Sequence, residues 1–306
     1  MRILVTGGAG FIGSHVVDLL VRYGHDVVVV DNLSHGDRAN VSARARFIHG
    51  DVLDPGAWLG QVRTADAVVH LAAQISVPIS EKNPPEDVRA NVLGTVEMLQ
   101  AARWLKVREF RLASSAAVYG DNPHMPLKEN DAGIPLSYYG LNKWAAELYV
   151  GHESRLGRMT GTVLRMANVY GPRQRTQGEG GVVAIFCEAL AGGKTPTIDG
   201  DGGQTRDFIA VGDVARAFLH RLGEKHAGGT FNIGTGRATS VMDLWMTLAN
   251  LAGVPSGLTR HGPPRPGDIR ESVLDVSSAS RWGFRAAVPL AEGLSETYRW
   301  FLDVNR

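Results

Sequence analysis

The stretch SYYGLNK, residues 137–143, places a tyrosine and a lysine where they can act together. Tyr139 stands four residues before Lys143, whereas Tyr138 stands four before Asn142. In a helix, residues four apart share a face, so only Tyr139 would lie beside the lysine. An ammonium ~4 Å away stabilises a phenolate by ~4 kcal/mol at an effective dielectric constant of ~20, before desolvation is subtracted. The pair could therefore remove a hydroxyl proton, although such a pair taken alone is more often an ordinary surface contact.

Segments that favour strands alternate with segments that favour helices on both sides of this pair. Continuous apolar, β-branched runs predict strands at 2–7, 26–31, 45–51, 67–73, 109–115 and 160–166. Amphipathic stretches predict helices at 14–24, 91–105 and 137–155. Unbroken apolar strands separated by helices are typical of a parallel sheet covered on both faces. The sequence therefore predicts an α/β fold with a Rossmann-type, doubly wound parallel sheet.

The composition changes after residue 168. Glycine and proline become frequent in YGPRQ, GEGG, DGDGG and HGPPRPGD, and helices are expected at 181–192, 212–223, 241–252 and 290–302. We expect a larger first domain over 1–168 and a smaller C-terminal lobe over 169–306. Some segments of the second part, such as 206–236, could return to the first domain.

The charge and cysteine content exclude several classes of protein. The 306 residues carry 32 Lys and Arg against 31 Asp and Glu, so a net charge of +1 gives no electrostatic reason to expect nucleic acid or an anionic membrane. The one cysteine, Cys187, lies in an apolar run and indicates a reducing compartment. No run approaches ~18 apolar residues, and the first ten residues lack a signal-peptide pattern. We expect a cytoplasmic protein without a membrane segment, and no metal, because the ten histidines lack metal-ligand spacing.

The first predicted strand leads into a glycine-rich turn that opens a helix. Glycine lets the backbone approach a pyrophosphate, whose charge meets the free N–H groups and the positive dipole end of the helix. With a strand before it and a helix after it, the turn predicts dinucleotide binding rather than a simple tight turn. The expected contacts come from Gly7, Gly10, Phe11, Ile12 and Gly13.

Acidic residues end the next two predicted strands. Asp31 stands 18 residues after Gly13, where its carboxylate can accept hydrogen bonds from both ribose hydroxyls and would repel a 2′-phosphate. This favours NAD over NADP. Asp51 and Val52 are placed to meet the adenine, although an ordinary strand-end aspartate is a common alternative. The end of the fourth predicted strand, Leu71, Ala72 and Ala73, is expected to face the site, where small residues leave room for the dinucleotide.

Eight motifs occur in an order that resembles one enzyme family. They are TGGAGFIGSH, DNLS, HLAAQ, SSAAVYG, SYYGLNK, NVYGPRQ, DGGQTRDF and RPGD. Together they resemble the extended short-chain dehydrogenase/reductase family, which includes the NAD-dependent epimerases and dehydratases of nucleotide sugars. The resemblance covers nearly the whole chain and is strongest to the UDP-glucose (UDP-galactose) 4-epimerases. It implies a homodimer, formed through the helices at 91–105 and 140–155, and we expect Met98, Leu99, Trp144 and Leu148 on their outer faces. The core of a large α/β domain could bury some of these four instead.

The resemblance implies roles for the residues around the Tyr–Lys pair. Tyr139 would be the acid/base, and Lys143 would also hold the nicotinamide ribose. Ser115, four residues before Tyr119, would hydrogen-bond the reacting hydroxyl, whereas its neighbour Ser114 would not. Asn32 and Asn91 would join the cofactor contacts. Ile75 departs from some epimerases, which have a lysine near the cofactor at this point.

The resemblance also places substrate contacts in the second lobe. Arg206 and Arg265 would grip a pyrophosphate through paired hydrogen bonds. Asn168 would contact the sugar nucleotide, and Asp268 would contact the uridine ribose. Ser272 stands where a tyrosine restricts related enzymes to glucose and galactose, so UDP-GlcNAc and UDP-GalNAc could also fit.

Two alanines bear on the expected reaction. The related 4,6-dehydratases carry Asp-Glu directly after the catalytic Ser or Thr, and the decarboxylases carry a Glu there, whereas this chain has Ala116 and Ala117. Methyl groups cannot act as acid or base, so the resemblance implies epimerisation at C4 of a UDP-hexose through a transient 4-keto sugar. The alternatives are a nucleotide-sugar decarboxylase, dehydratase or reductase, or a non-catalytic NAD-binding protein.

Overall fold

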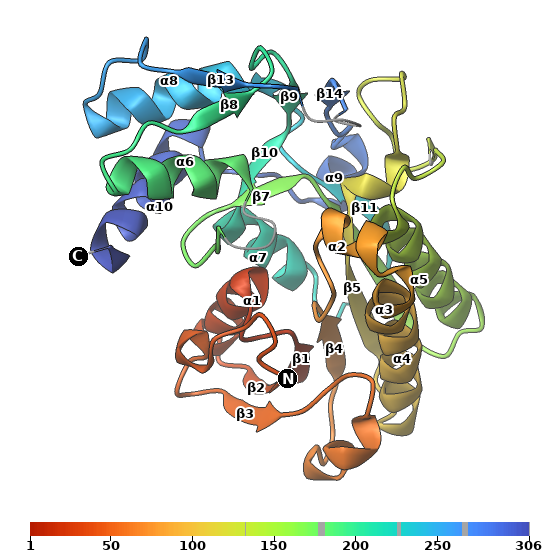
Figure 1. Cartoon of the computed structure of the whole chain (residues 1–306). Coiled ribbons are helices and arrows are strands. Elements are labelled where there is room, and N and C mark those ends of the chain that lie inside the picture. The colour runs from red at the N-terminus through yellow and green to blue at the C-terminus, as the bar shows by residue number, and fades with distance from the viewer. Residues whose placement is uncertain (132, 177–180, 225–227, 265–268, 306) are drawn as a thin grey trace.

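The computed structural model describes residues 1–131, 133–176, 181–224, 228–264 and 269–305. Within these ranges the centre of the larger part is a seven-stranded sheet in the order β11-β6-β5-β4-β1-β2-β3, with every neighbouring pair parallel (Figure 1). Its strands are β1 (Arg2–Thr6), β2 (Asp26–Asp31), β3 (Arg46–His49), β4 (Ala67–His70), β5 (Glu109–Ser115), β6 (Thr160–Met166) and β11 (Gly229–Ile233). The predicted fold class is confirmed.

Helices cover both faces of this sheet because the strands are apolar on both faces. In β1, Ile3 and Val5 pack into one hydrophobic cluster, whereas Leu4, between them, packs into another. The first cluster includes residues of α1 (Phe11–Arg22) and α7 (Val211–Leu219), and the second includes residues of α4 (Gly94–Trp104) and α5 (Tyr138–Arg155). Figure 1 shows these two helix pairs on opposite sides of the sheet. Such continuous burial is what a parallel sheet requires.

The strand order reverses beside β1. The chain runs outward from β1 through β2 to β3, and then crosses to β4 on the other side of β1. Ligands of open α/β sheets bind outside the carboxyl ends of the strands at such a switch point. The turn after β1 and the loop after β4 therefore mark the expected cofactor site.

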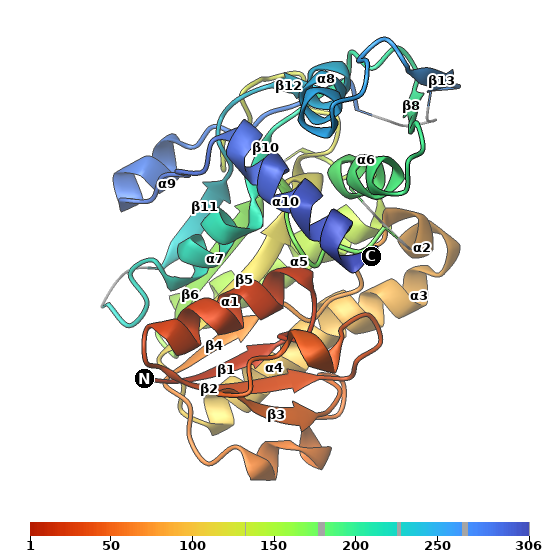
Figure 2. The same ribbon diagram turned by 90° about the vertical axis from the view of Figure 1, so that its left-hand side faces the viewer.

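The smaller lobe follows β6 directly, so it lies at the carboxyl end of the sheet. It has three small sheets in the described ranges, which pair β7 (Asn168–Tyr170) with β10 (Phe208–Ala210), β8 (Thr197–Asp199) with β13 (Arg260–Gly262), and β9 (Thr205–Arg206) with both β12 (Thr239–Ser240) and β14 (Glu271–Ser272). Its helices α6 (Val182–Ala191), α8 (Val241–Ala252) and α10 (Leu290–Val304) pack around a third cluster that contains Phe186, Trp245 and Phe301 (Figure 2).

The chain passes between the two parts more than once. After β10 it enters α7, which packs on α1, and then β11, which extends the large sheet beside β6. The short helix α9 (Ser277–Trp282) contacts β11. The assignment of cofactor binding to residues 1–168 and substrate binding mainly to 169–306 stays a prediction.

Several element boundaries differ from the sequence prediction. The fourth strand ends at His70, so Leu71–Ala73 lie beyond it. The first helix begins at Phe11, because Gly10 already occupies the N-cap position. A π-helical turn at Val88–Leu93 precedes α4, and two short helices, α2 (Val77–Lys82) and α3 (Pro84–Asp87), come before it. Among the described residues, no helix combines the length and apolar character needed to cross a bilayer.

The prediction that Met98 and Leu99 lie on outer helix faces is wrong. Their exposed fractions are 0% and 4%, because both pack into the apolar layer between the helices and the sheet. Trp144 is half-buried, and Leu148 alone of the four is exposed, at 55%. Other exposed large hydrophobic side chains on α4 and α5 are Trp104, Tyr138, Leu141 and Tyr149.

Candidate active site

The glycine turn after β1 packs too closely for side chains. Gly7 has φ +71°, and a Cβ there would lie 2.6 Å from the Ala72 nitrogen. A Cβ on Gly13 would lie 2.0 Å from the Gly7 carbonyl oxygen. A Cβ on Gly10, by contrast, would meet only the Gly7 oxygen, at 3.3 Å, and would otherwise project into open space at the helix start. This arrangement leaves the backbone accessible to a diphosphate.

The start of α1 is suited to an anion. Gly10 is its N-cap, no described side chain caps it, and no acidic residue lies in its first turn. The first N–H groups of a helix have no partner within the helix and carry the positive end of its dipole. Phe11, Ile12 and Gly13 supply these groups, as the sequence predicts for a pyrophosphate site.

Asp31 lies at the end of β2, directly beside the glycine turn. Its exposed fraction is 8%, and its two oxygens accept hydrogen bonds from the Ala9 N–H at 2.9 Å and the Leu33 N–H at 2.8 Å. These two bonds hold the carboxylate at the carboxyl edge of the sheet. Its position fits the predicted contact with a ribose.

The next polar residues along this edge also lie together. Asn32 donates a hydrogen bond from Nδ2 to Asp51 Oδ2 at 2.9 Å, and the Leu53 N–H donates to Asp51 Oδ1 at 2.8 Å. Val52 is half-buried and packs against the cluster beneath α4. The structure thus brings Asn32 and Asp51 together, and both lie near the end of β2.

The loop after β4 lies against the glycine turn and leads to Asn91. The Ala72 N–H donates to Thr6 Oγ1 at 3.4 Å, which fixes the stretch Leu71–Ala73 beside β1. Asn91 is buried and donates from Nδ2 to the Gln74 carbonyl at 2.9 Å. Its Oδ1 is buried without a hydrogen-bond partner among the described residues. An unmatched buried acceptor is uncommon, and a cofactor hydroxyl is a suitable donor for it.

Tyr139 and Lys143 lie in the first turns of α5. The helix begins at Tyr138, and the Lys143 Nζ lies 5.8 Å from the centroid of the Tyr139 ring. Tyr139 is half-buried, whereas 44% of Tyr138 is exposed. The predicted pairing of the lysine with Tyr139 rather than Tyr138 matches this geometry.

The start of α5 is held by hydrogen bonds from two sides. Ser137 caps the Gly140 N–H at 3.1 Å, and Ser80 of α2 accepts the Tyr139 N–H at 3.1 Å. A Cβ on Gly140 would lie 2.5 Å from the Ala117 carbonyl oxygen, so glycine lets the helix approach the loop that follows Ser115. Tyr139 is thus brought close to the end of β5.

Ser115 and Ser114 have different surroundings at that strand end. Ser115 is the last residue of β5, is half-buried, and accepts a hydrogen bond from the Ala117 N–H at 3.2 Å. Ser114 is buried and donates to the Glu147 carboxylate, which also forms a 2.7 Å ion pair with Arg165. The Ser114 hydroxyl is therefore buried and already bonded to Glu147, which supports Ser115 as the predicted contact of the reacting hydroxyl.

The Lys143 ammonium is buried and donates a hydrogen bond to the Ala113 carbonyl at 3.2 Å. Burial lowers the pKa of Lys143 to about 8, although the carboxylates of Asp87 and Glu147 act to raise it. His70 lies on β4 between Thr6 and Thr95, and burial, together with the Lys143 charge, lowers the pKa of His70 to about 3. The imidazole is therefore neutral, and the lysine is the cation of this site.

Three predicted substrate residues are joined by the backbone of the small lobe. The Asn168 N–H donates to the Asp207 carbonyl at 2.9 Å, and the Asp207 N–H donates to the Ser272 carbonyl at 3.0 Å. Ser272 also pairs with Arg206 across β14 and β9. Asn168 is exposed, and Arg206 and Ser272 are half-buried. Arg265 and Asp268 lie outside the described residues.

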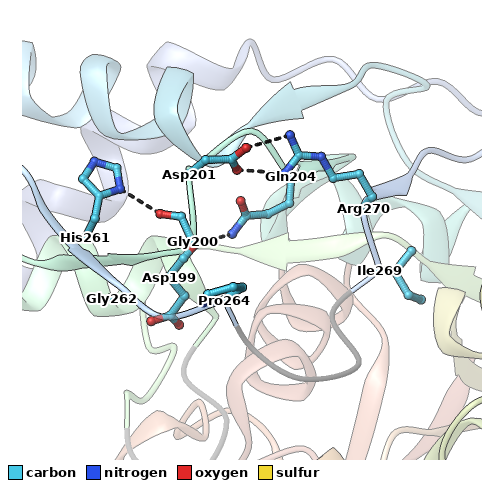
Figure 3. Close-up of a pocket in the computed structure, with 9 residues that line it drawn as sticks. All are labelled: Asp199, Gly200, Asp201, Gln204, His261, Gly262, Pro264, Ile269 and Arg270. Atoms are coloured by element: carbon cyan, nitrogen blue, oxygen red, sulfur yellow. Dashed lines mark hydrogen bonds and ion pairs between the residues drawn. The ribbon is translucent and has the colours of Figure 1, made fainter.

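A hollow of about 680 Å³ lies in the same lobe, and none of the predicted catalytic residues lines it (Figure 3). Its wall includes Gln204 and Ile269, and an ion pair between Arg270 and Asp201 borders it, with N–O distances of 2.8 and 3.0 Å. His261 Nδ1 bonds the Gly200 carbonyl at 2.8 Å on another side. This hollow was not predicted from the sequence, because its wall joins β8, β13 and the segments beside them, which come together only in the folded chain.

The sequence also did not predict a group of polar residues next to Lys143 in the structure. Gln74, Asp87 and Asn142 are joined by hydrogen bonds, and Asp87 and Asn142 are buried. Gln74 closes the motif HLAAQ and Asn142 lies in SYYGLNK, but neither was assigned a role there, and Asp87 lies in no motif. Among the described residues, no grouping of His, Cys, Asp or Glu is suited to a metal ion.

A glycine cradle at the switch point of a parallel sheet, together with a Tyr–Lys helix at the end of β5, defines the class of short-chain dehydrogenases/reductases. A family model described as "NAD dependent epimerase/dehydratase family" matches residues 3–234. The chain belongs to this family, as its motifs predict.

Relatives and solved structures agree with this assignment. The UDP-glucose 4-epimerase of Mycolicibacterium smegmatis is 42% identical over 315 residues, which cover 100% of both chains. The crystal structure of UDP-glucose 4-epimerase from Thermotoga maritima with UDP-glucose has a TM-score of 0.95 at 40% identity and covers 100% of both chains. The UDP-glucose 4-epimerase of Thermus thermophilus in complex with NAD has a TM-score of 0.91 at 38% identity, covering 98% of this chain and 99% of that one.

Proposed function

We propose that this protein is an NAD-dependent isomerase that interconverts the C4 epimers of a UDP-hexose, UDP-glucose and UDP-galactose. The observation that carries the proposal is the arrangement at the end of β5. There Ser115 ends the strand, Tyr139 is half-buried in the first turn of α5, and the buried Lys143 Nζ lies 5.8 Å from the centre of the tyrosine ring. The similarity to UDP-glucose 4-epimerases over the full length of the chain supports the same reaction.

The chain's own residues carry out the proton chemistry. Tyr139 removes the proton from the C4 hydroxyl and later returns it, because the positive charge of Lys143 stabilises the phenolate. Ser115 donates a hydrogen bond to the reacting oxygen and orients it. The oxygen keeps this contact as the hydroxyl becomes a carbonyl and then a hydroxyl again.

The glycine turn, Asp31 and Asn91 would hold the cofactor. NAD, when bound there, supplies a hydride acceptor for C4 and a hydride donor for the return step. The helix start suits its pyrophosphate, Asp31 suits a ribose without a 2′-phosphate, and the Asn91 acceptor suits a further hydroxyl. Because the hydride leaves and returns within one cycle, the reaction needs no external reductant.

The loop after Ser115 favours epimerisation over the other reactions of the family. Ala116 and Ala117 begin the short helical turn Ala116–Tyr119, and neither can donate or accept a proton through its side chain. Dehydration needs an acid and a base for protons at C5 and C6. Without this acid and base, the 4-keto sugar keeps its C5 and C6 substituents. When it turns over in the site and takes the hydride back on its other face, the result is epimerisation at C4.

The small lobe supplies the groups for the nucleotide half of the substrate. Arg206 lies beside Ser272, and Asn168 joins them through the Asp207 backbone. The adjoining hollow of about 680 Å³ falls in the size range of ligand sites, so we assign the uridine end to it. The small Ser272 side chain leaves room at the sugar, which extends the proposed substrates to UDP-GlcNAc and UDP-GalNAc.

We also propose a cytoplasmic homodimer. The exposed apolar side chains on α4 and α5, Trp104, Leu141, Leu148 and Tyr149, give these helices a surface that a second copy could cover. The buried Cys187 fits a reducing compartment. Sedimentation velocity of the purified protein tests the assembly, and a monomer at micromolar concentration would contradict it.

The Tyr139→Phe variant tests the proposed chemistry. The purified protein is incubated with UDP-galactose without added NAD, and the products are identified by NMR. Wild type should form UDP-glucose without accumulating NADH, whereas Tyr139→Phe should lose about 10²–10⁴-fold in kcat because its general base is gone.

The matched control is Tyr138→Phe, which removes the neighbouring, more exposed hydroxyl and should stay within about twofold of wild type. NAD extracted from both variants should match wild type, since the hydroxyl contributes little to cofactor retention. Full activity in Tyr139→Phe would exclude Tyr139 as the base. Release of NADH or loss of CO₂ would instead identify another reaction of the family.

A further inference from the structure

Asp87 is a completely buried carboxylate next to the proposed catalytic pair. It ends α3, and its side chain has an exposed fraction of 0%. Its Oδ1 accepts hydrogen bonds from Gln74 Nε2 at 2.5 Å and Asn91 Nδ2 at 3.0 Å, and its Oδ2 accepts one from Asn142 Nδ2 at 2.6 Å. All three donors are neutral amides, so they satisfy the oxygens without cancelling the charge.

The three amides belong to three segments that the reaction needs. Gln74 follows the stretch Leu71–Ala73 after β4, and Asn91 is a proposed cofactor contact in the π-helical turn. Asn142 directly precedes Lys143 in α5. One carboxylate therefore fixes the cofactor loop, the cofactor asparagine and the catalytic helix relative to each other.

The charge of Asp87 also has a use at this site. A buried ammonium is costly unless an opposite charge accompanies it. Two carboxylates act on Lys143, those of Asp87 and Glu147, and Asp87 has the larger effect. Glu147 is already paired with Arg165 at 2.7 Å. Of these two carboxylates, Asp87 is the one whose hydrogen-bond partners are all neutral, so no cation among them offsets its charge.

The other titratable groups around Lys143 do not replace this charge. His70 on β4 is neutral, because burial lowers its pKa to about 3. Tyr139, one turn earlier on α5, is the group that the lysine serves. Among the described residues, the charges around the lysine are therefore Asp87 on α3 and the Glu147–Arg165 pair of α5 and β6.

We propose that Asp87 is a positioning residue for proton transfer: it keeps Lys143 protonated through its charge and holds the catalytic helix through Asn142. The proposal rests on the proposed function only in that Tyr139 and Lys143 form the proton-transfer pair. Asp87 acts through Lys143 and Asn142, and we assign it no contact with the substrate or the reacting atoms.

The Asp87→Asn variant removes the charge and changes little in size. Loss of a nearby negative charge favours the less protonated form of every group beside it, so the pKa values of the coupled Tyr139–Lys143 pair should both fall. The pH profile of kcat should therefore move to lower pH by about one unit, the usual scale for one close charge. Glu86→Gln removes an exposed acid from the same short helix and should leave the profile in place.

A second readout needs no substrate. Ultraviolet difference titration, wild type minus Tyr139→Phe, isolates the Tyr139 phenolate from the other six tyrosines. Burial raises the pKa of Tyr119 to about 12, so that residue does not interfere near neutral pH. The same difference is then measured between Asp87→Asn and the double variant Asp87→Asn/Tyr139→Phe. We expect the Tyr139 phenolate to form at lower pH in the Asp87→Asn protein.

The outcomes separate the two proposals. An active wild type whose pH profile and phenolate titration do not move in Asp87→Asn overturns the role of Asp87. An inactive wild type overturns the proposed function, while the titration still decides whether Asp87 controls the pair. If Asp87→Asn does not fold, Asn142→Ala decides the positioning role: kcat should fall about tenfold with the profile in place, and an unchanged kcat overturns the proposal.

Discussion

At the scale of single residues, Ser272 is the residue that we propose decides which sugars fit. It pairs with Arg206 across β14 and β9, and its carbonyl accepts the Asp207 N–H at 3.0 Å. The backbone at this position is therefore held by its pairing with β9 and by the residue that follows β9. A larger side chain at 272 cannot move away with its backbone and must occupy the space beside it.

The Ser272→Tyr variant should lose activity toward N-acetylated substrates. A small difference in the size of a substrate typically changes kcat/KM by about 10–200-fold. We therefore expect kcat/KM for UDP-GlcNAc to decrease by a factor in this range. The value for UDP-glucose should change less than about threefold, because glucose lacks the acetamido group. Steady-state kinetics with both sugars measure this, with Ser272→Ala as the control. Equal turnover of UDP-GlcNAc in Ser272→Tyr would contradict the assignment.

Residue spacing predicted the proposed catalytic pair but could not predict the buried residues near it. Tyr139 and Lys143 are four apart in a helix, so local geometry alone places them on one face. Asp87 and Asn142 are 55 positions apart and meet only because α3 and α5 pack together. No local pattern marks Asp87 as buried, since aspartate is usually exposed. Such contacts depend on the tertiary fold, which spacing does not encode.

At the scale of elements, the glycine turn shows how closely β1, α1 and the loop after β4 approach one another. The closest hypothetical Cβ contacts of Gly7 and Gly13 are with backbone atoms, which cannot rotate out of the way as a side chain can. The turn must therefore stay compact for the first N–H groups of α1 to face a diphosphate. Cofactor retention should be very sensitive to any added atom here.

Gly13→Ala should weaken cofactor binding strongly. Its Cβ would lie 2.0 Å from the Gly7 oxygen, so the turn has to open. We expect a drop of at least about tenfold in NAD affinity, which corresponds to ~1.4 kcal/mol, together with a lower Tm. Isothermal titration with NAD and thermal unfolding measure these changes.

Gly212→Ala is the matched control for that substitution. It adds the same atom in α7, where nothing lies within 4 Å of the new Cβ, and alanine favours a helix over glycine. NAD affinity and Tm should therefore stay the same or rise. Equal NAD affinity in Gly13→Ala and wild type would show that the turn does not hold the cofactor.

The sequence predicted elements with strong patterns and missed those defined by packing. Apolar runs located the strands from β1 to β6, because both faces of each strand are buried. β11, with the sequence GTFNI, carries a weak signal and becomes a strand by pairing with β6. The helical faces of α4 were assigned wrongly at Met98 and Leu99, because a helix between a sheet and its neighbours buries more than one narrow stripe.

At the scale of the whole molecule, the two parts are tied together by a chain that crosses between them. The small lobe begins directly after β6, and α7 and β11 bring the chain back to the large sheet. The residues that we propose bind the substrate therefore follow the carboxyl end of the large sheet, which is also the end that carries the glycine turn after β1. This arrangement fits the proposed reaction, in which the cofactor stays bound and returns the hydride it takes.

Transfer of an isotopic label tests this claim most directly. The protein is incubated with UDP-galactose that carries deuterium at C4, without added NAD, and the product is analysed by NMR. If the hydride leaves C4 and returns to the opposite face within one closed cycle, the UDP-glucose formed retains deuterium at C4. Protium at C4 would contradict the account, and so would deuterium at C6.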